Sequence, residues 1–261
     1  MSATKDTSGP WRTEISDADE TSLRFRGYDV TRLMEQASFS DVVFLLHQGR
    51  RPTEAERRLL DAILIGVADH EPASPSAAAA RVVASGNRGA PEAAVAAGVL
   101  AIGDEHAGAG HACMLLIDEG LRRAREGPLT LEAAAKITVA EAKAAKVRVP
   151  GFGHRVHTSI DPRTAVLFGL AKDRGLAKDG IAFMRALETV VRDEIKPLPI
   201  NIDGALAAVL YDLGFPPLFG KLAFIIGRVA GLTAQVAEEY TRERPMRIRF
   251  PVTYDGEPPR E

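Results

Sequence analysis

Cysteine, tryptophan and long apolar runs are all scarce in this chain of 261 residues. Cys113 is its only cysteine, so no disulfide can form within the chain. The apolar run around Cys113 favours a structural thiol in a reducing compartment over a nucleophile. No window reaches about 18 uninterrupted apolar residues, so the sequence predicts no membrane span. The polar segment Met1–Pro10 lacks the apolar centre of a signal peptide, and we therefore expect a cytoplasmic protein.

An excess of charge of either sign is also missing, because 33 Lys and Arg stand against 35 Asp and Glu. Such a chain creates no field that would attract nucleic acid or an anionic membrane, so an anion site must be built from locally placed arginines. Walker-type glycine loops, zinc-spaced clusters and nucleophile elbows do not occur in the sequence. We therefore expect small-molecule partners, with no nucleic acid, no membrane and no metal.

Hydrophobic residues make up 46 % of the chain, which is enough for a substantial core. They recur at helical spacing in segments that glycine and proline separate. We expect helices over residues 53–68, 77–83, 91–100, 112–117, 133–146, 162–175, 181–195, 205–213 and 222–236. No β-rich region and no repeat of fixed period is apparent, so the sequence predicts an all-α fold.

Chemistry-bearing residues are concentrated in the stretch Pro150–Arg163, which holds two histidines and two arginines. Gly151 and Gly153, on either side of Phe152, free the backbone for positive φ and for close approach of a ligand. A turn is the local structure that we expect here.

A helix start follows that turn. Asp161 before Pro162 is typical of an N-cap with proline at the first helical position. Arg163 would then leave the first helical turn, where an anion is favoured. A carboxylate site and a solvent-exposed loop are both compatible with this pattern.

The run Gly-Phe-Gly-His-Arg-Val over residues 151–156, followed by Asp-Pro-Arg over 161–163, resembles the citrate synthase superfamily. Further matches in the same order extend the resemblance from about Leu23 to Gly256. It implies a citrate synthase-like helical fold with the active site in a cleft between two domains. A large domain would comprise residues 21–106 and 209–261, a small one residues 107–208, and residues 1–20 would be a flexible arm.

The resemblance assigns a catalytic triad to three breaks between helices. His106 lies in a glycine-rich turn, His154 in the stretch described above, and Asp203 before its helix. The resemblance implies that Asp203 is the acid or base at the α-carbon of an acyl-CoA and that His106 donates to the enolate oxygen. His154 would act on the oxygen of the partner substrate. Each residue alone could be a cap or a solvated turn residue, and only their joint spacing supports the assignment. His70 matches a further substrate-contacting histidine, with a capping or core role as the alternative.

Arginine binds carboxylates through a rigid fork, and a tricarboxylate requires several such forks. The resemblance implies this role for Arg163, Arg228 and Arg249. Arg228 is the only charge in an otherwise apolar expected helix, where an unpaired guanidinium would be costly. In the family the third arginine comes from the neighbouring subunit, which implies a homodimer. Arg249 keeps the family's spacing, and Arg244 before Pro245 remains an alternative.

No permanently bound cofactor is expected, because the resemblance implies a coenzyme A thioester as substrate or product. Gly151, Phe152 and Gly153 would face its adenine. The candidates for its phosphates are Lys143, Lys146, Arg148 and Arg155. These bases could equally form a solvated helix face.

Two departures separate the chain from full citrate synthases. It is much shorter, and Ala73 stands where the family has asparagine. The Pro-Ala-x-x-Ser pattern at Pro72–Ser76 and the run Asn201–Gly204 resemble stand-alone citryl-CoA lyases and the lyase module of ATP-citrate lyase. We therefore expect cleavage of citryl-CoA, or a close homologue, to acetyl-CoA and oxaloacetate. Where relatives have His-Gly-Gly-Ala, Ala107 adds a methyl group that could alter acyl-CoA access.

Two other functions stay open from the sequence. One is condensation of an acyl-CoA with oxaloacetate, to citrate or methylcitrate. The other is a catalytically silent subunit that binds coenzyme A. The sequence also leaves open whether a citryl-CoA synthetase partner is needed.

Overall fold

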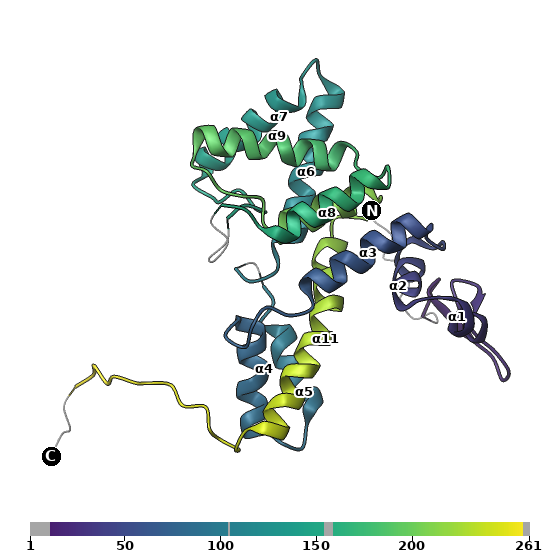
Figure 1. Ribbon diagram of the computed structural model, residues 1–261, viewed down its shortest axis with the longest axis vertical. Coiled ribbons are helices and arrows are strands. Elements are labelled where there is room, and N and C mark those ends of the chain that lie inside the picture. Colours follow the sequence, from purple (N-terminus) through teal and green to yellow (C-terminus); the bar gives the residue numbers. More distant parts are fainter. Residues whose placement is uncertain (1–10, 104, 154–158, 258–261) are drawn as a thin grey trace, which may run out of the picture.

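The computed structural model describes residues 11–103, 105–153 and 159–257, and over these residues the chain is built mainly of helices (Figure 1). The elements in chain order are β1 (Ser16–Ala18), β2 (Leu23–Phe25), β3 (Tyr28–Asp29), α1 (Val30–Gln36), α2 (Phe39–Gln48), α3 (Glu54–Val67), α4 (Pro75–Gly86), α5 (Pro91–Leu100), α6 (Ala109–Glu126), α7 (Leu131–Ala145), α8 (Pro162–Asp173), α9 (Asp179–Glu194), α10 (Ile202–Asp212) and α11 (Phe219–Arg242). The predicted all-α class is confirmed.

A small antiparallel sheet, β1-β2-β3, precedes the helices and was not expected from the sequence. The carboxylate of Asp19 forms its first turn by accepting hydrogen bonds from the backbone N–H groups of Thr21 and Ser22, both at 2.9 Å. Arg26 then attaches the sheet to α2, since its guanidinium donates to the carbonyl of Leu46 at 3.0 and 3.1 Å. Three strands of two or three residues leave too short a pattern for alternation to be recognised.

Helix starts follow the capping chemistry of the sequence. Thr53 and Glu56 form the predicted capping box of α3, and Asp161 caps α8 with proline at its first position. The start of α10 is an exception, because Asn201 is its cap and Asp203 lies in its first turn. The expectation that Asp203 precedes its helix was therefore wrong.

Helix α6 also begins earlier than expected, at Ala109, inside the glycine-rich run. Gly110 there faces Gly220 of α11, and a Cβ at Gly110 would lie 2.7 Å from the carbonyl oxygen of Gly220. Glycine is thus placed in a helix interior because two backbones meet there. The glycine-rich pattern had indicated only a turn.

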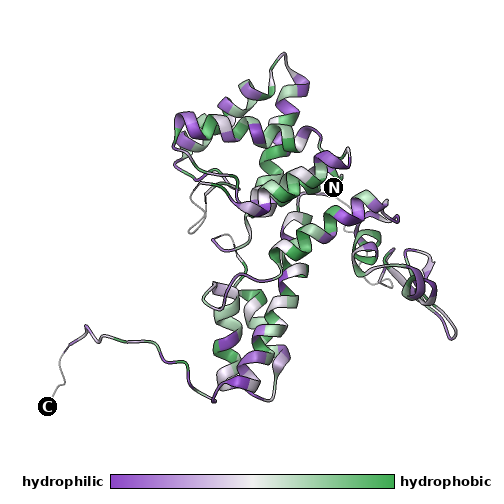
Figure 2. Ribbon diagram, in the orientation of Figure 1, coloured by the Kyte–Doolittle hydropathy of each residue, from purple (hydrophilic) through white to green (hydrophobic). Residues whose placement is uncertain are grey.

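Two clusters of buried apolar residues hold the fold together. The larger one gathers side chains of α2, α3, α6, α7, α8, α9, α10 and α11. The smaller one joins α4 and α5 to α11 through Ala80, Ala84, Ala94, Leu232 and Val236. Apolar residues line the helices of both clusters, whereas the last turns of α11 are hydrophilic (Figure 2). Helix α11 is long and apolar enough to pass for a membrane span, as a core helix often is, and its buried apolar side chains are divided between the two clusters.

After α11 the chain leaves the helices as an extended C-terminal arm (Figure 1). Residues 249–257 of this arm are exposed. Phe250 keeps 68 % of its surface exposed, Val252 87 % and Tyr254 77 %. The division into domains at residues 20, 106 and 208 stays a prediction.

Candidate active site

The glycine turn at residues 151–153 lies against the N-terminus of α10. Asn201 N–H donates to the carbonyl of Gly151 at 3.0 Å, and Gly153 N–H donates to the carbonyl of Pro199 at 2.9 Å. The side-chain amide of Asn201 donates to the carbonyl of Gly153 at 2.8 Å. Gly151 and Gly153 have φ values of 85° and 81°, so the predicted positive φ is confirmed at both. These contacts bring the turn to the helix that carries Asp203.

The turn leaves no room for a side chain at Gly151. A Cβ there would lie 2.8 Å from Sγ of Cys113 and 2.8 Å from Cα of Gly204. Cys113 is fully buried beneath the turn, and burial together with the charge of Asp203 raises the pKa of its thiol. A thiol held in its neutral form is a poor nucleophile, which agrees with the structural role expected for it.

Asp203 is the most perturbed carboxyl group of the site. The residue is half-buried, but its Oδ1 is shielded from solvent and accepts no hydrogen bond from the described residues. Burial raises its pKa to about 6, against the opposing effect of the positive charges of Arg163 and Arg228. Because Asn201 supplies the helix cap, the side chain of Asp203 is not needed for capping. A carboxyl with a pKa near 6 is suited to take and to give a proton near neutral pH.

His106 is fixed by a tight turn and by Ser76 of α4. The turn is closed by two backbone hydrogen bonds between Gly103 and His106, at 2.9 and 3.0 Å. Nε2 of His106 accepts from the backbone N–H of Ser76 at 3.3 Å and lies 3.0 Å from its Oγ. An atom that accepts from a backbone N–H carries no proton, so the neutral ring carries its proton on Nδ1. Nδ1 is therefore the atom of His106 that can donate.

The residue after His106 has an unusual backbone. Ala107 takes a φ of 64°, in the left-handed region that disfavours a side chain. Such a conformation costs roughly 1–2 kcal/mol for a residue with a Cβ. The methyl group that the sequence places in this turn is thus held in a strained conformation beside a candidate catalytic histidine.

Arg228 is buried in α11, with 2 % of its surface exposed. Its Nε donates to the carbonyl of Val67 at 2.9 Å, and Nη1 donates to Oγ of Ser76 at 3.0 Å. Burial lowers its pKa, while the charges of Asp69 and Asp203 act in the opposite direction. Its hydrogen-bond partners are neutral oxygens, and the expectation that this guanidinium faces an anion stays a prediction.

Arg163 is already held by a carboxylate of its own chain. Its Nε donates to Oδ1 of Asp161 at 3.0 Å and its Nη2 to Oδ2 at 2.8 Å. Nη1 lies 3.4 Å from the carbonyl oxygen of Gly66 at the end of α3. Asp161 thus orients the fork, and a bound carboxylate would use Nη1 or replace one of these contacts.

The remaining candidates are distributed as follows. His70 is half-buried just after α3. Lys143 donates to the carbonyl of Glu194 at 3.3 Å, and Lys146 ends α7 in a left-handed conformation. His154 and Arg155 lie outside the described residues, so their roles stay predictions.

The C-terminal arginines fall into two groups. Arg242 pairs with Glu238, and Arg247 pairs with Glu239 and Glu243. Arg244 and Arg249 are exposed and form no ion pair within the described part of the chain. Both alternatives for the third carboxylate arginine are therefore without an ion-pair partner among the described residues.

Sequence reasoning missed Ser76 and the second role of Asp161. Ser76 is the last residue of the Pro-Ala-x-x-Ser pattern, which served only to distinguish family members. Asp161 was predicted as a helix cap, but its carboxylate also binds Arg163. The spacing of two residues between an aspartate and an arginine at a helix start was the available signal.

Comparison with known proteins identifies the family. A family model described as "Citrate synthase, C-terminal domain" matches residues 9–58 and 48–249. A citrate synthase of Heyndrickxia coagulans is 30 % identical over 228 residues, which cover 85 % of this chain and 57 % of that protein. One from Helicobacter pylori is 31 % identical over 227 residues, covering 82 % of this chain and 48 % of that protein. The chain thus spans about half the length of these relatives.

Solved structures give the same family. The citryl-CoA lyase of Hydrogenobacter thermophilus has a TM-score of 0.87 and 39 % identity, and the match covers 96 % of both chains. The citrate synthase of Thermoplasma acidophilum, solved with carboxymethyl coenzyme A and oxaloacetate, has a TM-score of 0.68 and 26 % identity. That match covers 86 % of this chain and 58 % of the other. The chain therefore belongs to the citrate synthase family.

Proposed function

We propose that this protein is a lyase that cleaves citryl-CoA, or a close homologue, into acetyl-CoA and oxaloacetate. The observation that carries the proposal is the state of the Asp203 carboxyl. Burial raises its pKa to about 6, while the positive charges of Arg163 and Arg228 act in the opposite direction. Likeness to a citryl-CoA lyase over 96 % of both chains supports the lyase over the longer synthases.

The proposed cleavage begins at the tertiary hydroxyl of the substrate. His154 removes the hydroxyl proton, the bond between the two carbons breaks, and oxaloacetate forms with its ketone. The bonding electron pair passes to the thioester and gives the enolate of acetyl-CoA. Nδ1–H of His106 donates to the enolate oxygen, and protonated Asp203 gives its proton to the carbon. Acetyl-CoA results, and the proton on His154 returns to Asp203 through solvent.

Substrate binding is assigned to the arginines and His70. Arg163 and Arg228 would each hold one carboxylate, and Arg249 of a second copy would hold the third, in a homodimer. Coenzyme A would lie along the turn at residues 151–153, with its phosphates near Lys143, Lys146 or Arg155. The proposed location of the enzyme is the cytoplasm.

Condensation is the second candidate, because the family model and the curated relatives are named for citrate synthase. The two reactions leave different products from the same intermediate. A lyase converts supplied citryl-CoA to acetyl-CoA and oxaloacetate and releases no free thiol. A synthase hydrolyses it to citrate and free coenzyme A.

The test supplies purified protein with citryl-CoA and measures oxaloacetate and free thiol in parallel. The proposal predicts oxaloacetate without thiol, and thiol without oxaloacetate would establish the synthase. A protein that binds coenzyme A, measured by calorimetry, yet forms neither product from citryl-CoA would be the silent subunit.

A further inference from the structure

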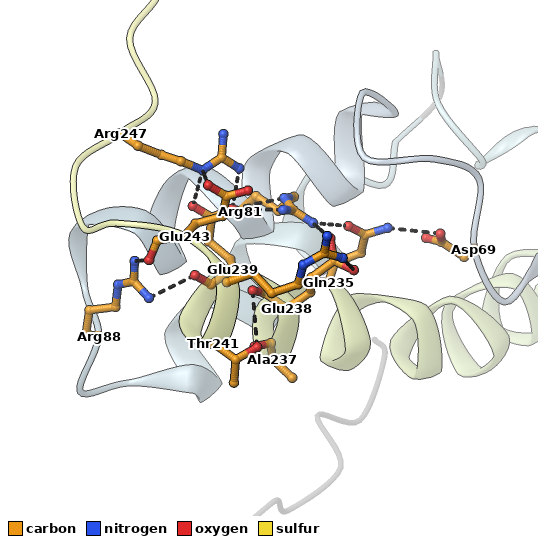
Figure 3. Close-up of polar contacts among 11 residues, drawn as sticks. Asp69, Arg81, Arg88, Gln235, Ala237, Glu238, Glu239, Thr241, Glu243 and Arg247 are labelled. Atoms are coloured by element: carbon orange, nitrogen blue, oxygen red, sulfur yellow. Dashed lines mark hydrogen bonds and ion pairs between the residues drawn. The ribbon is translucent and has the colours of Figure 1, made fainter.

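A buried carboxylate fastens the root of the C-terminal arm. Glu239 of α11 is fully buried and lies between two guanidiniums (Figure 3). Nε of Arg81 of α4 donates to its Oε2 at 3.1 Å, and Nη2 of Arg81 forms an ion pair with the same oxygen at 3.0 Å. Arg247 of the arm donates from Nε at 3.0 Å and from Nη2 at 2.5 Å. A buried charge is tolerated only when it is paired, so the arm and α4 depend on the same carboxylate.

Arg81 also binds the side chain of Gln235, one turn earlier on α11. Nη1 of Arg81 donates to Oε1 of Gln235 at 2.7 Å, and Nε2 of Gln235 donates to Oδ2 of Asp69 at 3.0 Å (Figure 3). Arginine has only donors and a carboxylate only acceptors. The amide of Gln235 therefore has one satisfied orientation, oxygen toward Arg81 and nitrogen toward Asp69.

This chain of contacts ends at Asp69, beside the candidate active site. Asp69 directly precedes His70, the predicted substrate-contacting histidine. Its charge also acts on Arg228, whose pKa it raises against the effect of burial. Asp69 thus accepts a hydrogen bond from Gln235, and its negative charge acts on Arg228, a proposed carboxylate-binding arginine.

The opposite end is the point where the arm leaves the fold. Met246 N–H donates to the carbonyl of Ser85 at 2.9 Å. Arg88 donates to the carbonyls of Glu239 and Glu243 at 2.8 and 2.7 Å. Arg247 is the arm's charged anchor, and residues 249–257 beyond it are exposed.

We propose that Arg81 and Gln235 are positioning residues, which couple the anchoring of the arm at Arg247 to the placement of the Asp69–His70 segment. Release of Arg247 leaves Arg81 as the remaining cation at the buried Glu239 carboxylate among the described residues, which draws Arg81 toward Glu239. Gln235 then loses the partner that orients its amide toward Asp69. The segment that presents His70 loosens as a result. The catalytic consequence rests on the proposed function, because it concerns the binding of the substrate's carboxylates.

The test combines hydrogen exchange with kinetics in the full-length protein. Arg247→Ala removes the anchor and Gln235→Leu removes the amide at similar volume. We expect amide exchange in residues 66–74 to rise in both variants, and the KM for citryl-CoA to rise about threefold to tenfold at nearly unchanged kcat. Arg192→Ala is the matched control, because Arg192 of α9 forms an exposed ion pair with its neighbour Asp193 outside this network, and it should change neither quantity.

A third variant separates coupling from a general loss of structure. Gln235→Glu can still accept from Arg81, but it has no N–H for Asp69 and sets a like charge against it. It should leave exchange near residue 247 unchanged and raise exchange in residues 66–74. Unchanged exchange in residues 66–74 in Arg247→Ala, or in both Gln235 variants, would overturn the coupling. Because exchange is measured without substrate, a wild type that shows the expected exchange but cleaves no citryl-CoA would refute the proposed function and leave the coupling standing.

Discussion

The hydroxyl of Ser76 lies 3.0 Å from Nε2 of His106, and the same oxygen accepts a hydrogen bond from Arg228 at 3.0 Å. One serine therefore connects the proposed enolate donor to a proposed carboxylate arginine. Its hydroxyl can donate to the histidine while it accepts from the arginine, which holds the proton of His106 on Nδ1.

Ser76→Ala should lower turnover about tenfold and stability by about 1–3 kcal/mol, because a buried guanidinium loses a hydrogen-bond partner. Steady-state kinetics and urea unfolding measure the two effects. Ser85→Ala is the matched control on the same helix, since the Ser85 hydroxyl is buried without a hydrogen-bond partner among the described residues. Equal behaviour of the two variants would remove Ser76 from the account.

Ala107→Gly should relieve the strained backbone beside His106. Because φ at this position is 64°, we expect stability to stay level or to rise by up to about 1 kcal/mol. Ala96→Gly, at an exposed position inside α5, should instead lower stability by about 1 kcal/mol. Thermal unfolding checks both, and cleavage assayed with citryl-CoA and methylcitryl-CoA shows whether removal of the methyl group widens acyl access. A loss of stability in Ala107→Gly as large as in Ala96→Gly would show that the conformation carries no strain.

The raised pKa of Asp203 makes a prediction for stability as a function of pH. Burial raises the pKa from 3.8 to about 6, so the folded chain holds the proton more tightly than the unfolded chain. The stability from this group is complete below the unfolded value and is lost as pH rises through about 6. At pH 7.5 the folded protein bears the cost of a buried charge, and Asp203→Asn should be more stable by about 3 kcal/mol.

Urea unfolding at two pH values measures this difference. At pH 4 and below, the gain from Asp203→Asn should largely disappear, because the wild-type carboxyl is then protonated. A variant that is less stable than the wild type at pH 7.5 would mean that the Asp203 carboxylate is stabilised by contacts in the fold.

The proposed homodimer predicts complementation between two inactive variants. Arg249→Ala subunits lack the arginine given to the partner, and Asp203→Asn subunits lack the proton donor. In a mixed dimer one site has both groups, so statistical exchange of subunits should restore roughly a quarter of wild-type activity. Mixed dimers that form but stay inactive would exclude a trans-acting Arg249 and direct attention to Arg244.

Much of the fold could be predicted because local chemistry determines it. Thr53 and Asp161 cap their helices as their side chains require, and the glycines at 151 and 153 take the positive φ for which glycine is suited. The start of α10 was missed because Asn201 and Asp203 are both capping residue types, and only the surrounding fold decides between them.

The site was harder to predict than the helices because its contacts join distant parts of the chain. Ser76 and Arg228 are separated by 152 positions, and no local pattern connects them. The pairing of Arg163 with Asp161 is local in sequence. Whether Asp161 binds the guanidinium of Arg163 depends on the burial of the aspartate, which the sequence does not show. The candidate triad comes from the resemblance, and for His106 the structure adds Ser76 as a hydrogen-bond partner.

The central claim is that Asp203 gives the proton that completes cleavage, and one comparison tests it most directly. Single-turnover cleavage of citryl-CoA is measured for the wild type and Asp203→Asn, with calorimetry of coenzyme A and oxaloacetate binding on the same samples. We predict that binding is retained and that the rate of acetyl-CoA formation falls by a factor of about 10² to 10⁴. Asp203→Asn protein that forms acetyl-CoA at the wild-type rate would contradict the account.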